Sequence, residues 1–226
     1  MEKWKDINIL YEDNHLLVVV KPFNIPTCPD ESKDNNLLDI LKDYIKVKYT
    51  KPGNVYLGLV HRLDRPVSGI MVFAKTSKAA ERLTKQIKEN KLNKTYYAII
   101  EGDLKNKDTL KDYLIKDGKT HNTYITSKDK GKEAILNYEV IEKKDNLNLI
   151  KIELITGRHH QIRVQFSSRG YPLYGDHRYN KNFINDKYSN IALIAKYLSF
   201  YHPITKELLK FEIDTPKNYP WNLFQR

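Results

Sequence analysis

One short polar segment, between two apolar runs, carries side chains suited to nucleophilic or acid–base chemistry. It runs from His61 to Gly69 and reads His-Arg-Leu-Asp-Arg-Pro-Val-Ser-Gly. In an extended chain Arg62 and Asp64 point to the same side, and a neighbouring guanidinium lowers the pKa of a carboxylate, which keeps it ionised. Asp64, between Arg62 and Arg65, is therefore a candidate reactive carboxylate. An aspartate that caps a turn and pairs with arginine in solvent is the alternative.

A second polar segment, Gly157 to Arg163, concentrates basic side chains where a helix is expected to begin. The apolar spacing that follows predicts a helix over 158–168. The first turn of a helix has free N–H groups and a positive dipole end, which suits a phosphate. Arg163, one turn in, is placed to reach a neighbouring carboxylate instead. An ordinary basic first turn is the remaining alternative.

The sequence lacks the residue patterns typical of a metal site, of a serine or cysteine nucleophile, and of a nucleotide-binding loop. His159 and His160 are adjacent, so on a helix they diverge by about 100°, and no nearby carboxylate or cysteine completes a metal-binding set. Ser68 lacks the Gly-x-Ser-x-Gly elbow, and Cys28 has no local histidine partner. No glycine-rich nucleotide loop is present. We therefore expect no metal site, and the residues carry no nucleotide-binding signature.

Apolar runs between turn-forming residues predict the elements that must position these segments. Helical spacing predicts helices over 36–48 and over 78–90, the latter with Ser77 as its N-cap. No internal repeat, low-complexity linker or break in composition divides the chain. We therefore expect one α+β domain over residues 1–226, with a large, mostly antiparallel sheet flanked by helices and loops. Strands are expected over 7–11, 16–20, 56–61, 70–74, 95–101, 113–115, 124–126, 134–142, 147–155, 191–200 and 208–213.

The composition is that of a basic globular protein. The 226 residues have a formal net charge of +11, and 40% of them are hydrophobic and 11% aromatic, which excludes a disordered tail. The mean hydropathy is −0.63, and no apolar run approaches the roughly 18 residues of a membrane span. The chain start lacks an apolar leader, and a single cysteine fits a reducing compartment. We expect a soluble cytoplasmic protein, whose charge indicates a polyanionic partner or simply a lysine-rich surface.

Read in order, several segments resemble the RluA-type RNA pseudouridine synthases. They are Lys21-Pro22, His61 to Gly69, Lys94-Thr95-Tyr96-Tyr97-Ala98, Gly157 to Arg163, Pro172 to Tyr179, and Phe200-Tyr201-His202-Pro203. The resemblance covers the chain from Ile9 to about Pro216. The sequence departs from the family at Val67, His159 and Gln165, where Thr, Thr and His are usual. These departures bear on substrate preference and rate more than on the chemistry.

The resemblance implies the isomerisation of uridine to pseudouridine within RNA. The N1–C1′ bond breaks, the uracil turns, and C5 joins C1′, so no redox change occurs and no cofactor is implied. Asp64 would be the catalytic carboxylate, and attack on C1′ or removal of a C2′ proton are both open. Arg163 would pair with Asp64. Tyr96 would stack on the uracil or assist a proton transfer, unless it is simply a core aromatic of its strand.

The resemblance also implies RNA contacts around this site. Arg62 would occupy the space that the flipped base vacates, and Arg65, Arg158, His160 and Gln161 would be further RNA-binding residues. The fold would be a single catalytic domain with a central basic cleft, without an N-terminal S4-like RNA-binding domain, and a monomer. Its substrate would be ribosomal or transfer RNA. A catalytically silent RNA-binding module on the same scaffold is the main alternative, and a metal-dependent nuclease is disfavoured because the carboxylates are scattered.

Overall fold

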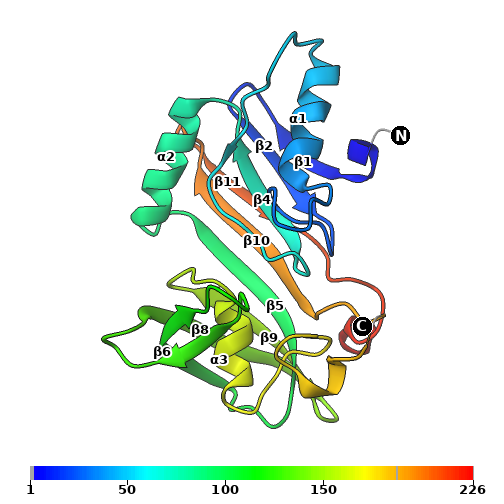
Figure 1. Ribbon diagram of the computed structural model, residues 1–226, viewed down its shortest axis with the longest axis vertical. Coiled ribbons are helices and arrows are strands. Elements are labelled where there is room, and N and C mark those ends of the chain that lie inside the picture. The colour runs from blue at the N-terminus through cyan, green and yellow to red at the C-terminus, as the bar shows by residue number, and fades with distance from the viewer. Residues whose placement is uncertain (1–2, 187, 226) are drawn as a thin grey trace. The chain divides into compact units, whose positions relative to one another are not determined.

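The computed structural model describes residues 3–186 and 188–225, so residues 1–2, 187 and 226 of the expected domain lie outside the described residues. The chain divides into two compact units, which can be followed by colour in Figure 1. Unit 1 comprises Met1–Asn93 and Ala195–Ile213, and unit 2 comprises Lys94–Ile194 and Asp214–Arg226. That residues 1–226 act as one domain stays a prediction.

Unit 1 contains a sheet in the order β1-β2-β4-β10, with β3 paired to β4 and β11 paired to β10. The pairings with a described register are antiparallel. Gly69 of β4 has a φ of +133°, and a Cβ there would lie 2.5 Å from the backbone nitrogen of Ala195 in β10. Glycine is therefore required for these strands to approach. The strands are β1 (Asn8–Glu12), β2 (Leu16–Lys21), β3 (Gly58–Leu59), β4 (Ser68–Ala74), β10 (Leu193–Tyr201) and β11 (Leu208–Glu212).

The core of unit 1 is built on strands that are apolar on both faces. Leu16 to Val19 of β2 and Ile70 to Ala74 of β4 are almost wholly buried. Alternate side chains of a strand share a face, and one face of β2 and β4 packs against Ala79 and Leu83 of the helix α2 (Ser77–Lys88). A continuous apolar strand is expected where both faces are covered.

Two helices and a short 3-10 helix, η1 (Lys3–Asp6), complete unit 1. The helix α1 (Leu37–Lys48) begins after Asn36, whose side chain accepts from the Asp39 N–H, which confirms the predicted helix over 36–48. The prediction that Ser77 caps α2 is wrong. Thr76 is the N-cap, because its backbone is extended and its side chain accepts a hydrogen bond from the Ala79 N–H.

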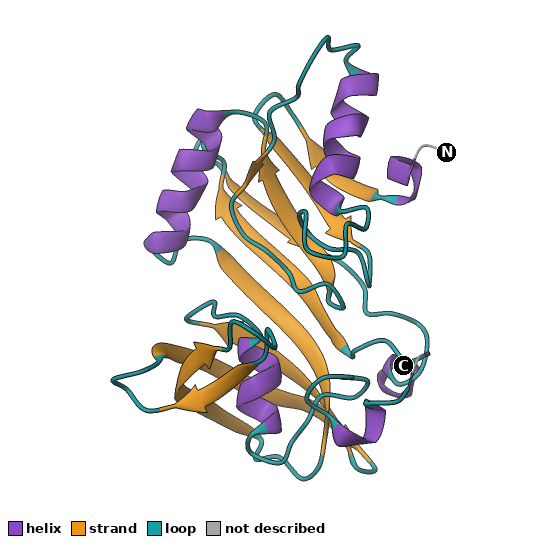
Figure 2. Ribbon diagram, in the orientation of Figure 1, coloured by secondary structure: helices purple, strands orange, loops and turns teal. Residues whose placement is uncertain are grey.

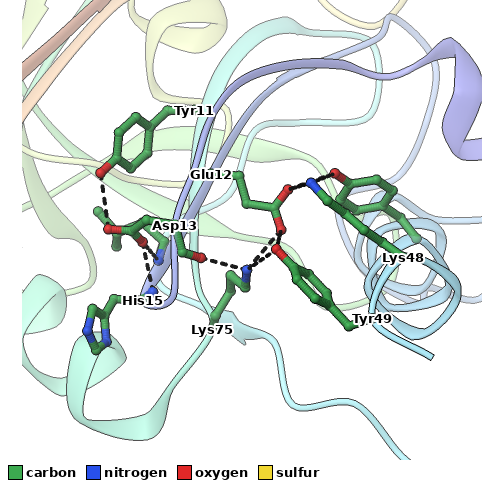
Figure 3. A network of polar contacts seen from close by, with 9 residues as sticks. Tyr11, Glu12, Asp13, His15, Lys48, Tyr49 and Lys75 are labelled. Atoms are coloured by element: carbon green, nitrogen blue, oxygen red, sulfur yellow. Dashed lines mark hydrogen bonds and ion pairs between the residues drawn. The ribbon is translucent and has the colours of Figure 1, made fainter. Parts of the chain in front are cut away.

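A network of hydrogen bonds around Glu12 ties α1 to the ends of β1 and β4, and Figure 3 shows most of its side chains. The Glu12 carboxylate accepts from Nζ of Lys48 at 2.6 Å and of Lys75 at 2.8 Å, and from the hydroxyls of Tyr44 at 2.7 Å and Tyr49 at 2.8 Å. Burial opposes ionisation of Glu12, but these hydrogen bonds outweigh it and lower its pKa to about 2. These four hydrogen bonds stabilise the ionised carboxylate within unit 1.

Unit 2 contains an antiparallel sheet in the order β5-β9-β8-β6-β7. The helix α3 (Gln161–Ser167) packs against it, with the rings of Phe166 and Tyr138 5.2 Å apart. Two short 3-10 helices, η2 (Lys181–Phe183) and η3 (Trp221–Phe224), follow. The strands are β5 (Asn93–Glu101), β6 (Lys107–Lys116), β7 (Thr123–Thr126), β8 (Lys132–Lys144) and β9 (Leu147–Leu154).

Several element boundaries differ from the prediction, and the strand expected over 56–61 is reduced to β3, Gly58–Leu59. The expected helix over 158–168 begins only at Gln161, because His160 has a φ of 50° in the left-handed region, which interrupts a right-handed helix. Ser68 and Gly69 belong to β4 rather than to the polar loop. Strand β6 is longer than the expected 113–115, and the prediction missed its start because residues 107–109 are polar and exposed and Leu110 is the strand's one apolar residue before Tyr113.

The structure confirms the predicted α+β class and the mostly antiparallel strand pairing, and Figure 2 shows how strands predominate over helices. Within residues 3–186 and 188–225, no helix has the length and apolar character needed to cross a membrane. The same residues contain no group of three or more His, Cys, Asp or Glu side chains arranged to hold a metal ion.

Candidate active site

Asp64 is half-buried in the loop between β3 and β4, and hydrogen bonds hold the main chain on both sides of it. The Thr27 hydroxyl donates to the Leu63 carbonyl at 2.7 Å, and Nζ of Lys21 donates to the Arg65 carbonyl at 2.9 Å. The Asp64 carbonyl accepts from the Val67 N–H at 3.0 Å. Asp64 is therefore presented from a fixed backbone, which a plain solvent-exposed turn does not provide.

Lys21, the last residue of β2, is fully buried and is the main support of this loop. Besides the Arg65 carbonyl, its Nζ donates to the carbonyls of Pro22 at 2.9 Å and Ile25 at 2.8 Å. Burial lowers the pKa of Lys21 to about 7, and the negative charge of Asp64 opposes this effect.

Our sequence reasoning missed this role of Lys21. We used it only to mark the end of a strand and as part of the Lys-Pro resemblance. The available signal is a lysine that ends an otherwise apolar strand and precedes a proline. Such a lysine is buried by its strand and must find acceptors, because a buried ammonium without them is costly.

The two arginines beside Asp64 lie at the surface. Arg65 pairs with Asp34 at 2.6 Å and donates to the Ser32 hydroxyl at 3.2 Å, with about half of each charged side chain exposed. An exposed pair of this kind contributes about 0–1 kcal/mol to stability, so Arg65 can exchange partners at little cost. Arg62 is exposed as well. Contacts of both residues with RNA stay predictions.

Arg163 of α3 forms a buried, bidentate ion pair with Asp176 in unit 2. Its Nε and Nη2 lie 2.8 Å and 2.7 Å from the two Asp176 carboxylate oxygens, and the side chains are 5% and 0% exposed. The Tyr179 ring lies 5.1 Å from the guanidinium carbon, and the Tyr179 N–H donates to Asp176. We did not anticipate the Asp176 partner, and the pairing of Arg163 with Asp64 stays a prediction.

Tyr96 lies in the middle of β5 and is 6% exposed. It is opposite Ile152 of β9, which in turn is opposite Tyr138 of β8. Residues opposite each other in a sheet share a face, so Tyr96 lies on the face of the unit 2 sheet against which α3 packs. The helix that carries Arg163 therefore packs on the same face of the unit 2 sheet that carries Tyr96.

The remaining predicted RNA-binding residues precede or begin α3. Arg158 is exposed, and its Nε donates to the Glu133 carbonyl. His160 is half-buried, with Nδ1 2.8 Å from the Tyr179 hydroxyl. Burial, reinforced by the nearby charge of Arg163, lowers the pKa of His160 to about 2, so the ring is neutral at physiological pH.

Gln161 is buried, and its amide makes three hydrogen bonds within unit 2. Its Oε1 accepts from the Arg158 N–H and the Thr156 hydroxyl, both at 2.9 Å, and its Nε2 donates to the Ile135 carbonyl at 3.1 Å. Gln161 therefore shapes the turn that leads into α3. A direct contact of Gln161 with RNA stays a prediction.

The three residues at which the sequence departs from the resemblance are at least partly buried, and among the described residues Gln165 Oε1 has no hydrogen-bond partner. Val67 is buried beside the Asp64 loop. Nδ1 of His159 lies 2.8 Å from the Thr123 hydroxyl. Nε2 of the buried Gln165 donates to Asp112 at 2.7 Å. Each of these side chains therefore has a packing or hydrogen-bonding role of its own.

Comparison with known proteins places these motifs in a family. Residues 15–168 match the family model described as RNA pseudouridylate synthase. The RNA pseudouridine synthase YhcT of Bacillus subtilis (strain 168) is 36% identical over 219 residues, which are 95% of this chain and 70% of that protein. Ribosomal large subunit pseudouridine synthase D of Pseudomonas aeruginosa is 32% identical over 231 residues, covering 96% of this chain and 71% of that protein.

A solved structure agrees with these sequence relatives. Human RNA Pseudouridylate Synthase Domain Containing 1 has a TM-score of 0.75 and 25% sequence identity, covering 93% of this chain and 84% of that chain. The family model, the sequence relatives and the similar structure therefore all match this chain over most of its length, including the motifs described above. The chain belongs to the RNA pseudouridine synthase family, whose members isomerise uridine to pseudouridine in RNA.

Proposed function

We propose that this enzyme modifies uridine in ribosomal RNA and that Asp64 is its catalytic carboxylate. The observation that carries the proposal is the main chain on either side of Asp64, which the side chains of Lys21 and Thr27 hold from within the core. A carboxylate on such a support is preorganised, and preorganised charge is the main electrostatic source of catalysis. Several relatives are named for the large ribosomal subunit, which supports ribosomal RNA over transfer RNA.

The reaction needs one carboxylate and no external reactant. The N1–C1′ bond breaks, the uracil turns, the C5–C1′ bond forms, C5 loses its proton and N1 gains one. The sugar carbon becomes electron-poor as the first bond breaks, and the Asp64 carboxylate either attacks C1′ or removes the C2′ proton. The released base recaptures the sugar, so the second carboxylate that glycosidases use to handle water is not needed.

Arg163 and Tyr96 are proposed as partners of Asp64. The guanidinium of Arg163 is held by Asp176 through Nε and Nη2, and Arg163 is proposed to pair with the Asp64 carboxylate as well. This pairing would give the Asp64 carboxylate a counter-charge and fix its rotamer. The Tyr96 ring would stack on the uracil or assist proton transfer at the base, since aromatic rings are the usual platforms for unstacked bases.

The RNA contacts follow from exposure and charge. Arg62, Arg65 and Arg158 are exposed and are proposed to contact the RNA, with Arg62 in the space that the flipped base leaves. His160 would contribute a neutral ring, and Gln161 would act through the main chain of Arg158, which its side chain holds. With a formal net charge of +11, we propose a basic cleft and a cytoplasmic monomer as the working form.

Release of tritium from RNA made with 5-tritiated uridine tests the proposed reaction, because joining C5 to the sugar expels the label. We expect release from ribosomal RNA that lacks the modification and little from transfer RNA, and release that survives EDTA. Release of tritium from transfer RNA alone would contradict ribosomal RNA as the substrate and identify transfer RNA instead. Salt-sensitive binding of both RNAs without release from either would instead identify a silent RNA-binding module.

A further inference from the structure

Lys94, in β5, has an unusual setting. It is half-buried and lies on the same face of the strand as Tyr96, because side chains two positions apart in a strand share a face. The neighbouring strands are apolar on this face, where Tyr96 is opposite Ile152, and Leu154 of β9 is opposite Leu136 of β8. The lysine stem therefore runs along an apolar surface next to the aromatic ring assigned to the uracil.

Three other buried lysines have acceptors, whereas Lys94 does not. Nζ of Lys21 donates to three carbonyls, and Nζ of Lys75 and of Lys196 each pairs with a carboxylate and a carbonyl. Within the described part of the chain, the Lys94 ammonium makes neither a hydrogen bond nor an ion pair. These three lysines thus have acceptors for their ammonium groups, whereas no residue in the described ranges supplies one for Lys94.

An ammonium group removed from water without an acceptor is unfavourable, and burial lowers the pKa of Lys94 below its usual range. A ligand that brings a negatively charged acceptor to this position would offset the free energy lost by burying the Lys94 ammonium. The phosphodiester matches this need, because it is singly charged, accepts hydrogen bonds only, and recurs at every step of an RNA strand. Lysine binds phosphate as a compact point charge.

We propose that Lys94 binds a backbone phosphate of the RNA, next to the uridine that stacks on Tyr96. The proposal rests on the proposed function, because that function assigns Tyr96 to the uracil. Two residues along a strand span about 6.6 Å, the scale of one nucleotide, so base and phosphate would be held by neighbouring side chains on one rigid strand. The competing role is a lysine whose stem merely covers apolar surface while its ammonium reaches water.

Salt-dependent binding separates these two roles. The variants are Lys94→Met, which removes the charge and keeps the stem, Lys94→Arg, which keeps the charge, and Lys151→Met as a matched control. Lys151 lies in β9 opposite Tyr97, on the other face of the same sheet, and pairs with Glu153. The affinity of each protein for a fluorescent 12-nucleotide oligouridylate is measured from 50 to 300 mM KCl, together with its melting temperature.

We expect Lys94→Met to bind about tenfold more weakly at low salt. Its slope of log affinity against log salt should be shallower by about 0.7, the loss of one phosphate contact with a single strand. Lys94→Arg and Lys151→Met should keep the wild-type slope. The melting temperature of Lys94→Met should be unchanged or higher, because the unpaired buried charge is gone. An unchanged slope of log affinity against log salt in Lys94→Met would overturn the proposal. This holds even if the variant binds more weakly, because a lower melting temperature would then explain the weaker binding by a loss of stability.

The outcomes also separate this proposal from the proposed function. A slope that depends on Lys94 in a protein that releases no tritium from RNA would support the phosphate site and contradict the catalytic function. Normal tritium release with a slope indifferent to Lys94 would leave the function standing and overturn the site.

Discussion

The ammonium of Lys21 donates a hydrogen bond to the main-chain carbonyl of Arg65 over 2.9 Å. Arg65 follows Asp64 directly, and Lys21 ends a strand that is buried in the core. The position of the candidate catalytic carboxylate is thus set by a core side chain 43 positions earlier in the chain. The charge of Asp64 also raises the pKa of this lysine against the effect of burial. A substitution of Lys21 is therefore expected to change both the stability of the protein and the position of Asp64.

Replacing Lys21 by methionine should destabilise the protein and impair turnover together. The change leaves three partly buried carbonyls, of Pro22, Ile25 and Arg65, without their shared donor. We expect a loss of about 2–4 kcal/mol in the free energy of unfolding, measured by urea denaturation. Lys107→Met, at an exposed position of β6, should change it by less than about 0.5 kcal/mol. A fully stable Lys21→Met protein would contradict the role assigned to this lysine.

Lys21 should also give the folded protein a characteristic pH dependence. Burial lowers its pKa to about 7 from an ordinary value of 10.5, with the charge of Asp64 opposing the shift. Between these values the unfolded chain binds more protons than the folded protein, so the stability contributed at this site rises with pH. The difference in unfolding free energy between wild type and Lys21→Met should therefore grow from pH 7 to pH 10. A constant difference would show that Lys21 keeps an ordinary pKa.

The buried pair of Arg163 and Asp176 should be sensitive to the loss of either charge. Asp176→Asn would remove the buried negative charge that pairs with both Nε and Nη2 of Arg163, and we expect a loss of about 3–5 kcal/mol in unfolding free energy. The exposed pair of Arg65 and Asp34 serves as the comparison, and Asp34→Asn should cost less than about 1 kcal/mol. Equal effects in the two variants, measured by chemical denaturation, would argue against a preorganised Arg163.

Glu12 should make the protein acid-sensitive in a defined window. Burial opposes its ionisation, but four hydrogen bonds outweigh it and lower its pKa to about 2 from 4.5 (Figure 3). A depressed carboxylate pKa contributes stability that is fully present above pH 4.5 and is lost as the pH falls toward 2. Wild type should lose stability across this window more steeply than Glu12→Gln, as followed by circular dichroism. Parallel acid unfolding of the two proteins would contradict the assignment.

The sequence predicted local features better than long-range ones. The helix over 36–48 was found because apolar spacing and a capping residue act within one turn, whereas the cap of α2 was displaced by one residue, since Thr76 and Ser77 have similar capping chemistry. The start of α3 was misplaced because a positive φ at His160 leaves no periodic signal.

The supports of the site were not predicted for a different reason. Asp176 was part of a segment that resembled the family, and Lys21 was part of another, but their partners lie 13 and 44 residues away along the chain. A hydrogen bond between distant residues depends on how the strands pair, and no pattern in either segment encodes it. The positions of candidate residues could therefore be identified from the sequence, while the contacts that prepare them for chemistry required the fold.

The most direct test of the account is tritium release by Asp64→Asn from ribosomal RNA made with 5-tritiated uridine. The substitution keeps the size of the side chain and removes its charge, and Asp103→Asn, at an exposed ion pair, is the matched control. We expect Asp64→Asn to lose at least about a thousandfold in single-turnover rate while keeping its melting temperature and RNA affinity, and Asp103→Asn to match wild type. Release by Asp64→Asn at a rate near that of wild type would contradict the assignment of Asp64 as the catalytic carboxylate.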